Sequence, residues 1–446
     1  MEKMQSVFIG VKSIIPQTVK IAHFLGFTGT KSRLTNALEW GFNYSIHRTE
    51  KRMISRNAAP RGGRRRLRVP AVTLTMAGRK GADTVLLKKT YTTPPASILP
   101  DHESKQTGEI YSGEDLAKII SSKVPCSFVR AVVAPQLVSY HFALENPLEL
   151  PKVKRLLEGV SAILHTEVKQ ASSDIAHFAL EIPRADRSTL YFKQALLTKD
   201  FDRATGLSAL FGVDTLNRPL VVNIQSLPHA LIGGTTGGGK SVLLNSIAVS
   251  LLFKHTPETL QFIIIDPKQV EFSGFAGLPH LLQPVITDPY QAIDTLASVC
   301  DLIDRRYKRM AAHKVKNAVE MGLPAVVVMI DELADLIILG KKPVETAIVR
   351  IAQLGRAAGV HLIVATQQPT VNVVTGLIKA NIPCRIALKT ATVSNSMVIL
   401  DGKGAEKLTG KGDALLKLPD RTTPIRFQAP LIESADIAPV IKYWSK

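Results

Sequence analysis

The second half of the chain alternates short apolar runs with polar segments long enough to form helices. The apolar runs are "HALIGG" (229–234), "LQFIIID" (260–266), "PAVVVMID" (324–331), "VHLIVAT" (360–366) and "CRIAL" (384–388). Apolar strands separated by helices are typical of a parallel sheet with crossover helices. One intervening segment has apolar residues every three or four positions, at Ile293, Leu296, Cys300, Ile303, Tyr307 and Met310. This half is therefore predicted to be α/β, with a parallel sheet.

Shorter apolar runs precede this pattern and indicate a smaller α+β domain over residues 110–225. Strands are expected within 126–144, 175–183 and 218–224, and an amphipathic helix over 150–165. The segment "TYTTPPASILPDHESKQTG" (90–108) has three prolines among small polar residues, which is typical of a linker. We therefore divide the chain into a basic N-terminal region with Arg-rich and Pro-rich segments (1–109), an α+β domain (110–225), a larger α/β domain (226–430) and a C-terminal tail (431–446).

Positive charge is concentrated in the N-terminal quarter. The 446-residue chain has a formal net charge of +19, and residues 1–105 contain 19 Lys/Arg against 6 Asp/Glu. Such an excess favours an anionic partner, either nucleic acid or an acidic membrane surface. Residues 51–68 contain eight Lys/Arg and no acid. Arg64, Arg65 and Arg66 are therefore expected either to grip DNA phosphates or to belong to a solvated linker.

Neither a membrane span nor a disulfide framework is indicated. No window has the 18 or so uninterrupted apolar residues that a membrane-spanning helix needs. The first 27 residues are weakly amphipathic and are interpreted as a soluble segment, with a helix lying on a surface as the alternative. The three cysteines are far apart and have no CxxC spacing. We expect a cytoplasmic chain without a transmembrane segment.

A glycine-rich segment, "GGTTGGGKSV" (233–242), comes at the end of the first predicted strand of the parallel sheet and precedes a predicted helix. It matches G-x-x-x-x-G-K-[ST], a pattern in which backbone N–H groups cradle phosphates and glycines keep side chains out of the way. Lys240 is expected to neutralise the β- and γ-phosphates, and the Ser241 hydroxyl to hold Mg²⁺. Contacts with ATP are expected from Gly234, Thr235, Thr236, Gly237, Gly238, Gly239, Lys240, Ser241 and Val242.

Polar residues at the ends of later strands complete this site. "VVVMIDEL" (326–333) ends its apolar run with Asp331 and Glu332. Asp331 suits Mg²⁺ coordination through water and Glu332 suits a general base, although two acids there also fit a helix cap. Gln367 ends the next strand and is expected to sense the γ-phosphate, the alternative being an ordinary surface residue. Asp266 and Lys268 are expected to form an ion pair at the sheet edge, without a chemical role.

These stretches together resemble the FtsK/SpoIIIE family of hexameric DNA translocases. The similar segments include "LPHALIGGTTGGGKSVLLN", "FIIIDPKQVEF", "VVVMIDELADLI", "RIAQLGRAAGVHLIVATQQP", "VVTGLIKANIPCRIAL" and "ILDGKGAEKLTGKGDALL". The resemblance covers about 125–430 and implies a RecA-like P-loop NTPase motor domain at 226–430. It also implies that identical subunits assemble into a ring, expected to be a hexamer, around double-stranded DNA. Arg356 matches the family arginine that reaches across to complete the ATP site of a neighbouring subunit. Arg385 is the second candidate for this role.

The chain departs from the family where basic residues face DNA. Three positions that are basic in the family are occupied here by Gln368, Val393 and Met397. A fourth basic position is retained as Lys379, and Lys389 is a nearby lysine that could substitute for a missing one. Lys379 and Lys389 are thus the expected channel contacts. The family's membrane-spanning region and its C-terminal winged-helix module are also expected to be missing. The basic N-terminal region would then load DNA or bind an unknown anchoring partner.

The resemblance implies an ATP-dependent DNA translocase that moves or packages duplex DNA, with ATP and Mg²⁺ as cofactors. An alternative is a coupling or secretion-type ATPase of a mobile element that engages a protein or nucleoprotein, which the altered channel residues favour. A third is a regulatory DNA-binding protein with an idle nucleotide site, which Asp331 and Glu332 disfavour.

Overall fold

The computed structural model describes residues 91–102, 111–170, 176–184 and 188–446. All of these fall within one structural unit, Arg79–Lys446. The predicted DNA contacts Arg64, Arg65 and Arg66 lie outside the described residues.

A four-stranded antiparallel sheet with two helices forms the first part of the described chain. Its strands are β1 (Cys126–Val133), β2 (Leu137–Leu144), β3 (Lys169–Gln170) and β4 (His177–Pro183), in the order β1-β2-β4-β3. Helices α3 (Gly113–Ser121) and α4 (Leu150–Leu164) pack with it, and their apolar residues share one core with Tyr140, Phe142 and Phe178. This part has the strands expected within 126–144 and 175–183, and α4 lies within the helix expected over 150–165.

The second sheet has nine strands in the order β6-β5-β13-β12-β11-β7-β10-β9-β8. Its bounds are β5 (Ser208–Asp214), β6 (Pro219–Asn223), β7 (His229–Gly233), β8 (Leu260–Ile265), β9 (Ala325–Ile330), β10 (Val360–Thr366), β11 (Cys384–Leu388), β12 (Asp413–Lys417) and β13 (Ile425–Gln428). The five apolar runs form β7 to β11, which are all mutually parallel. The predicted α/β fold with a parallel sheet is confirmed.

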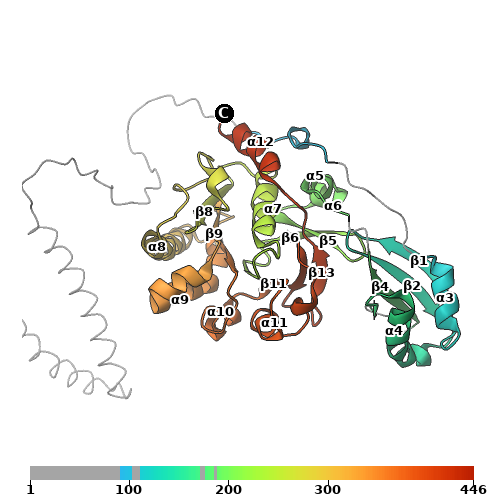
Figure 1. The fold of residues 1–446 in the computed structure, drawn as a ribbon. Coiled ribbons are helices and arrows are strands. Elements are labelled where there is room, and N and C mark those ends of the chain that lie inside the picture. The colour runs from blue at the N-terminus through green and yellow to red at the C-terminus, as the bar shows by residue number, and fades with distance from the viewer. Residues whose placement is uncertain (1–90, 103–110, 171–175, 185–187) are drawn as a thin grey trace, which may run out of the picture. The chain divides into compact units, whose positions relative to one another are not determined.

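Helices cover both faces of this sheet, so β7 to β11 are buried on each side (Figure 1). One core packs α7 (Lys240–Leu252) against alternate strand residues such as Ile232 and Ile264. The other packs α8 (Pro289–His313) and α9 (Leu333–Ala358) against the opposite residues, such as Leu231 and Ile263. The other α-helices among the described residues are α5 (Phe192–Leu196), α6 (Lys199–Arg203), α10 (Gly376–Asn381), α11 (Val393–Leu400) and α12 (Ser434–Trp444).

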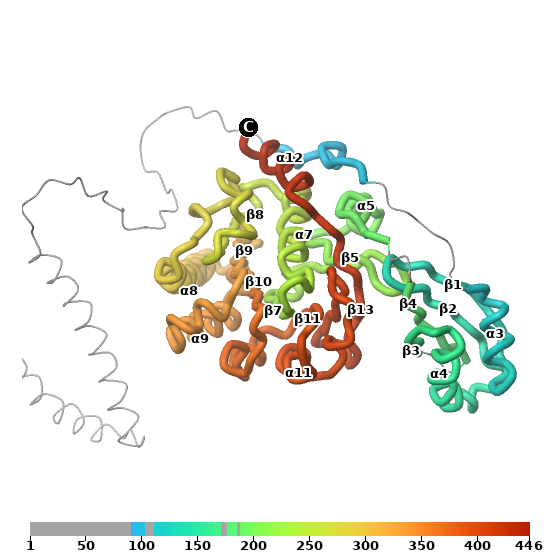
Figure 2. The backbone as a smooth tube through the Cα atoms, viewed as in Figure 1, coloured from blue at the N-terminus to red at the C-terminus, as the bar shows by residue number. Residues whose placement is uncertain are grey.

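Long-range pairings extend the sheet beyond its parallel part. β13 pairs with β5 although more than 200 residues separate them, and Figure 2 shows the two strands side by side. β5 and β6 precede residue 226, so the nine-stranded sheet draws on the segment that the sequence groups with the α+β domain. Residues 431–446, expected as a tail, contain α12, whose Val440, Ile441 and Trp444 are buried in the α7 core.

None of the helices in the described part of the chain combines the length and the apolar character that crossing a membrane requires.

Candidate nucleotide site

The glycine-rich loop connects β7 to α7 and needs glycine at its end. Gly239 caps α7 with a φ of 102°, a conformation that side chains rarely adopt. A Cβ added to Gly239 would lie 2.6 Å from the Gly412 nitrogen, so there is also no room for one. The first N–H groups of α7 have no partner within the helix, and they make its start a suitable place for an anion.

Five strand ends meet around this loop. Because β7 to β11 are parallel, the residues after them gather at one edge of the sheet, which is where open α/β sheets bind ligands. These residues are the loop after β7, Asp266 after β8, Asp331 after β9, Gln367 after β10 and Lys389 after β11. The predicted nucleotide residues are therefore brought together.

Lys240 and Asp331 form a buried ion pair. The Lys240 Nζ donates hydrogen bonds to the Asp331 Oδ1 at 2.5 Å and to the Asp331 carbonyl oxygen at 2.6 Å. The two residues are 3% and 1% exposed, so water screens the pair little. Burial raises the pKa of Asp331 above its ordinary value, although Lys240 opposes the shift. The predicted phosphate-binding and metal-binding residues thus contact each other directly.

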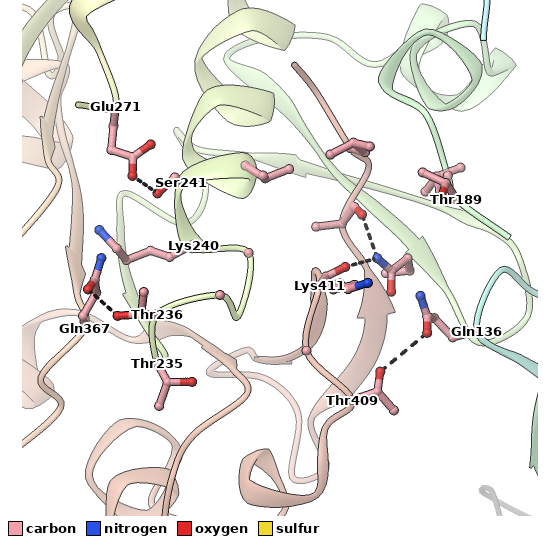
Figure 3. Close-up of a pocket in the computed structure, with 18 of the residues that line it drawn as sticks. Gln136, Thr189, Thr235, Thr236, Lys240, Ser241, Glu271, Gln367, Thr409 and Lys411 are labelled. Carbon is pink, nitrogen blue, oxygen red and sulfur yellow. Dashed lines mark hydrogen bonds between the residues drawn. The ribbon is translucent and has the colours of Figure 1, made fainter. Parts of the chain in front are cut away.

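Ser241 contacts a carboxylate for which the sequence predicted no role. Its hydroxyl donates a hydrogen bond to the Glu271 Oε1, as Figure 3 shows. Glu271 is partly exposed and lies on the loop that follows β8. The stretch "IIIDPKQVEF" contains it, but a single acid in a loop has no spacing that would distinguish it.

Glu332 is fully buried and both caps a helix and contacts the next strand. Its carboxylate accepts the backbone N–H of Ala334 at the start of α9 and the Thr366 hydroxyl at 2.6 Å. It also accepts the backbone N–H of Gln367 at 3.0 Å. Lys268 lies 3.6 Å from this carboxylate. The expected Asp266–Lys268 ion pair is wrong, because Lys268 faces Glu332 while Asp266 accepts backbone N–H groups of its own loop.

Gln367 lies against the glycine-rich loop. Its side-chain Oε1 accepts a hydrogen bond from the Thr236 hydroxyl at 2.9 Å (Figure 3). Together with the bond from its backbone N–H to Glu332, this contact connects the loop after β7 to the buried acid after β9. Gln367 is thus not an isolated surface residue.

A cavity of about 650 Å³ opens beside the loop. The glycine-rich loop, Glu271 and Gln367 form one part of its lining, and the segment Thr409–Lys411 and Gln136 form another (Figure 3). Gly412 donates its N–H to the Gly238 carbonyl at 2.9 Å, which holds the Thr409–Lys411 wall of the cavity against the glycine-rich loop. The sequence did not predict this wall, because its place beside the loop depends on β12 and β13, near the end of the chain.

Of the predicted basic residues, Arg356 and Arg385 lie away from this cavity. Arg356 is exposed in the last turn of α9, before β10, at the edge of the sheet opposite to the loop. The Arg385 guanidinium donates to Asp401, which also accepts from the Lys379 Nζ at 2.8 Å. Lys389 instead borders the nucleotide loop, since its carbonyl accepts the Thr235 N–H at 2.8 Å.

The three positions at which the sequence departs from the family's basic residues follow β10 and β11 and hold uncharged side chains. Val393 and Met397, one turn apart on α11, are 40% and 42% exposed. Gln368 follows β10, and its N–H is bonded to the Thr366 hydroxyl. These positions therefore present no positive charge.

Several known proteins are similar to this chain. The family model "FtsK/SpoIIIE family" matches residues 192–322 and 317–371. The protein named DNA translocase FtsK of Helicobacter pylori (strain J99) is 38% identical over 343 residues, which cover 74% of this chain and 40% of that protein. Its namesake in Campylobacter jejuni (strain 81-176) is 37% identical over 80% of this chain and 40% of that protein. The DNA translocase FtsK of Pseudomonas syringae pv. tomato is 35% identical over 79% of this chain and 49% of that protein.

A solved structure supports the fold. The pCW3 conjugation coupling protein TcpA, in its monomer form with ATPγS, aligns with a TM-score of 0.51 and 23% identity, covering 72% of this chain and 93% of that one. The chain spans between two fifths and a half of the length of the curated relatives above. Residues 192–371 of this chain therefore form an FtsK/SpoIIIE family domain.

Proposed function

We propose that this chain is a subunit of an ATP-driven motor that moves double-stranded DNA. The observation that carries the proposal is the meeting of the glycine-rich loop, Lys240 and Ser241 with the carboxylates Asp331 and Glu271 at one sheet edge. The relatives named DNA translocase FtsK, at 35–38% identity, support DNA as the substrate.

The residues of the loop fit a nucleoside triphosphate and Mg²⁺. Glycine lets the loop adopt a φ of 102° at Gly239 and pack closely on Gly412, and the start of α7 and Lys240 provide positive charge for phosphates. The Ser241 hydroxyl and the Asp331 carboxylate are hard oxygen donors, the type that Mg²⁺ prefers. When bound there, Mg²⁺ would neutralise charge on the β- and γ-phosphates.

Glu332 and Gln367 are assigned to hydrolysis. Glu332 would accept the proton of the attacking water, a role that requires an ionised carboxylate near the γ-phosphate. Gln367 would sense that phosphate, because it contacts the glycine-rich loop through Thr236 and Glu332 through its backbone.

Arg356 is proposed to act on a neighbouring subunit, within a ring of identical chains. It precedes β10, while its own nucleotide loop lies beside the far end of that strand. β10 has 7 residues, so its two ends are roughly 20 Å apart at about 3.3 Å per residue. This distance is too long for an arginine side chain to bridge, which supports a role in trans. An arginine finger typically contributes about 10³–10⁵ in rate.

DNA would be held by Lys379, by Lys389 and by the basic segment containing Arg64, Arg65 and Arg66. The exposed apolar side chains of Val393 and Met397 favour a second candidate, a coupling ATPase whose ring engages a protein or nucleoprotein. Apolar side chains gain more from a protein surface than from phosphates, whose contacts are largely electrostatic.

The deciding experiment measures ATP hydrolysis by the full chain with and without linear duplex DNA, over a range of salt concentrations. A DNA motor should be stimulated, and the stimulation should fall steeply with salt because phosphate contacts release counterions. Glu332→Gln, which should bind ATP without hydrolysing it, controls for contaminating activity. Replacing Arg64, Arg65 and Arg66 by Gln tests the basic segment. Hydrolysis that duplex DNA does not change would refute the DNA motor and favour the coupling ATPase.

A further inference from the structure

Glu271 is the carboxylate of the nucleotide cavity that the proposed roles leave unassigned. It lines the cavity together with Lys240, Ser241 and Gln367. Asp331 and Glu332, the acids expected from the sequence, are 1% and 0% exposed, and neither is among the residues that line the cavity. Glu271 is therefore the acid of this group that the cavity reaches directly.

Two backbone hydrogen bonds hold Glu271 in place. The Asp266 Oδ2 accepts the N–H of Glu271 and the N–H of Phe272, each at 3.0 Å. Phe272 is completely buried in the α7 core, where it packs edge-to-face on Phe275. The loop is thus anchored at Glu271 and at the residue that follows it, so the Glu271 side chain starts from a fixed point beside Ser241.

The hydrogen bond from Ser241 has a direction that suits a metal ligand. A hydroxyl has one proton and two lone pairs, so a proton donated to the Glu271 carboxylate leaves both lone pairs free. The accepting carboxylate also makes the hydroxyl oxygen a better donor to a cation, as partners behind a metal ligand generally do. The hydrogen bond that the Asp331 carboxylate accepts at Oδ1 comes from Lys240 rather than from Ser241.

Near Ser241, the described residues bring three carboxylates together with one buried ammonium. Asp266 and Glu271 lie close enough to act electrostatically on Asp331, Lys240 is the cation paired with Asp331, and Lys411 belongs to another part of the cavity lining. The Asp266 Oδ1 is buried and has no hydrogen-bond partner among the described residues. Uncompensated carboxylates in a buried position are costly, and a divalent cation would offset them.

We propose that Glu271 is a positioning residue of the Mg²⁺ site: it orients the Ser241 hydroxyl toward the cation and supplies negative charge behind it. The inference rests on the proposed nucleotide site and assigns to Glu271 the support of the metal ligand. Removing such a partner typically lowers metal affinity by about 10–100-fold.

The test measures binding of a fluorescent ATP analogue to the full chain, first in EDTA and then in a Mg²⁺ titration. We expect Glu271→Gln to bind the analogue in EDTA at least as well as wild type, because one negative charge near the phosphates is gone. The Mg²⁺ concentration that gives half of the metal-dependent gain should rise at least tenfold. Glu258→Gln removes an exposed acid before β8 and should leave both values unchanged.

A double variant shows whether Glu271 acts through Ser241. If it does, adding Glu271→Gln to Ser241→Ala should shift the Mg²⁺ midpoint little further than Ser241→Ala does alone. A Glu271→Gln midpoint equal to that of wild type, or fully additive shifts, would overturn the proposal. Binding in EDTA reports that each variant is folded. Wild-type protein that binds no analogue under either condition would instead refute the nucleotide site, and the role of Glu271 with it.

Discussion

The buried pair of Lys240 and Asp331 allows a prediction about stability that is separate from nucleotide binding. Lys240→Met keeps much of the side-chain volume but removes the ammonium and its two hydrogen bonds to Asp331. The Asp331 carboxylate would then remain buried without its cation. Breaking one half of a buried pair typically costs about 3–5 kcal/mol, whereas replacing both halves by neutral groups is often nearly neutral.

The loss of stability in Lys240→Met should depend on pH, because Asp331 can take up a proton. Burial already raises the pKa of Asp331, and loss of the nearby ammonium raises it further. A carboxyl whose pKa is higher in the folded than in the unfolded chain makes the folded chain less stable as pH rises. We therefore expect the full deficit, about 3 kcal/mol or more, at pH 8 and a smaller deficit at pH 5.5.

Urea unfolding of the nucleotide-free chain, followed by circular dichroism, measures this difference. Lys240→Met, Asp331→Asn and the double variant form a cycle in which the double variant should be more stable than the sum of the single losses predicts. A coupling of at least about 2 kcal/mol is expected. Stability of Lys240→Met equal to that of wild type at pH 8, or additive losses, would refute the buried pair.

Three further predictions follow from other contacts. Gly239→Ala should abolish binding of a fluorescent ATP analogue, because the new Cβ would meet backbone at 2.6 Å, while Gly274→Ala, whose Cβ meets nothing within 4 Å, should bind normally. Arg356→Ala should bind ATP without hydrolysing it, and mixing it with Lys240→Met subunits should restore hydrolysis; mixtures that stay inactive would contradict action in trans. Burial raises the pKa of Asp401, but hydrogen bonds from its cationic partners outweigh this and lower it to about 2. Its stabilisation should hold above the ordinary pKa of 3.8 and disappear toward pH 2, so the melting temperatures of wild type and Asp401→Asn should converge there.

The parallel strands could be predicted because each carries its information locally. β9 is buried at all six positions and is apolar throughout; β10 is also buried at every position and is apolar except for His361 and Thr366. The glycine-rich loop is likewise local, since one short segment contains the glycines, the lysine and the serine. Once these strands are parallel, Asp331 and Gln367 must lie at the same edge as the loop.

The antiparallel part of the sheet has no comparable local signal. β13 has four residues, and only its pairing with β5 reveals where it lies. This pairing brings the Thr409–Lys411 wall to the nucleotide cavity, so the wall could not be read from the sequence either. Glu271 was missed for a related reason: its position depends on the Asp266 carboxylate and the buried Phe272 ring, which a single acid in a loop does not indicate.

The polarity of the parallel strands also separates the two kinds of predicted basic residue. Lys240 and Lys389 lie at the carboxyl edge, whereas Arg356 and Arg385 belong to the amino edge. Arg385 is bonded to Asp401 and to the Lys379 carbonyl, so a role in catalysis would first require these bonds to break. Arg356 is exposed and carries no such cost. If the proposed roles hold, a chain that binds nucleotide at one edge and presents Arg356 at the other cannot complete its own site, whereas identical chains arranged head to tail can complete each other's, and such contacts generate a ring when their rotation closes.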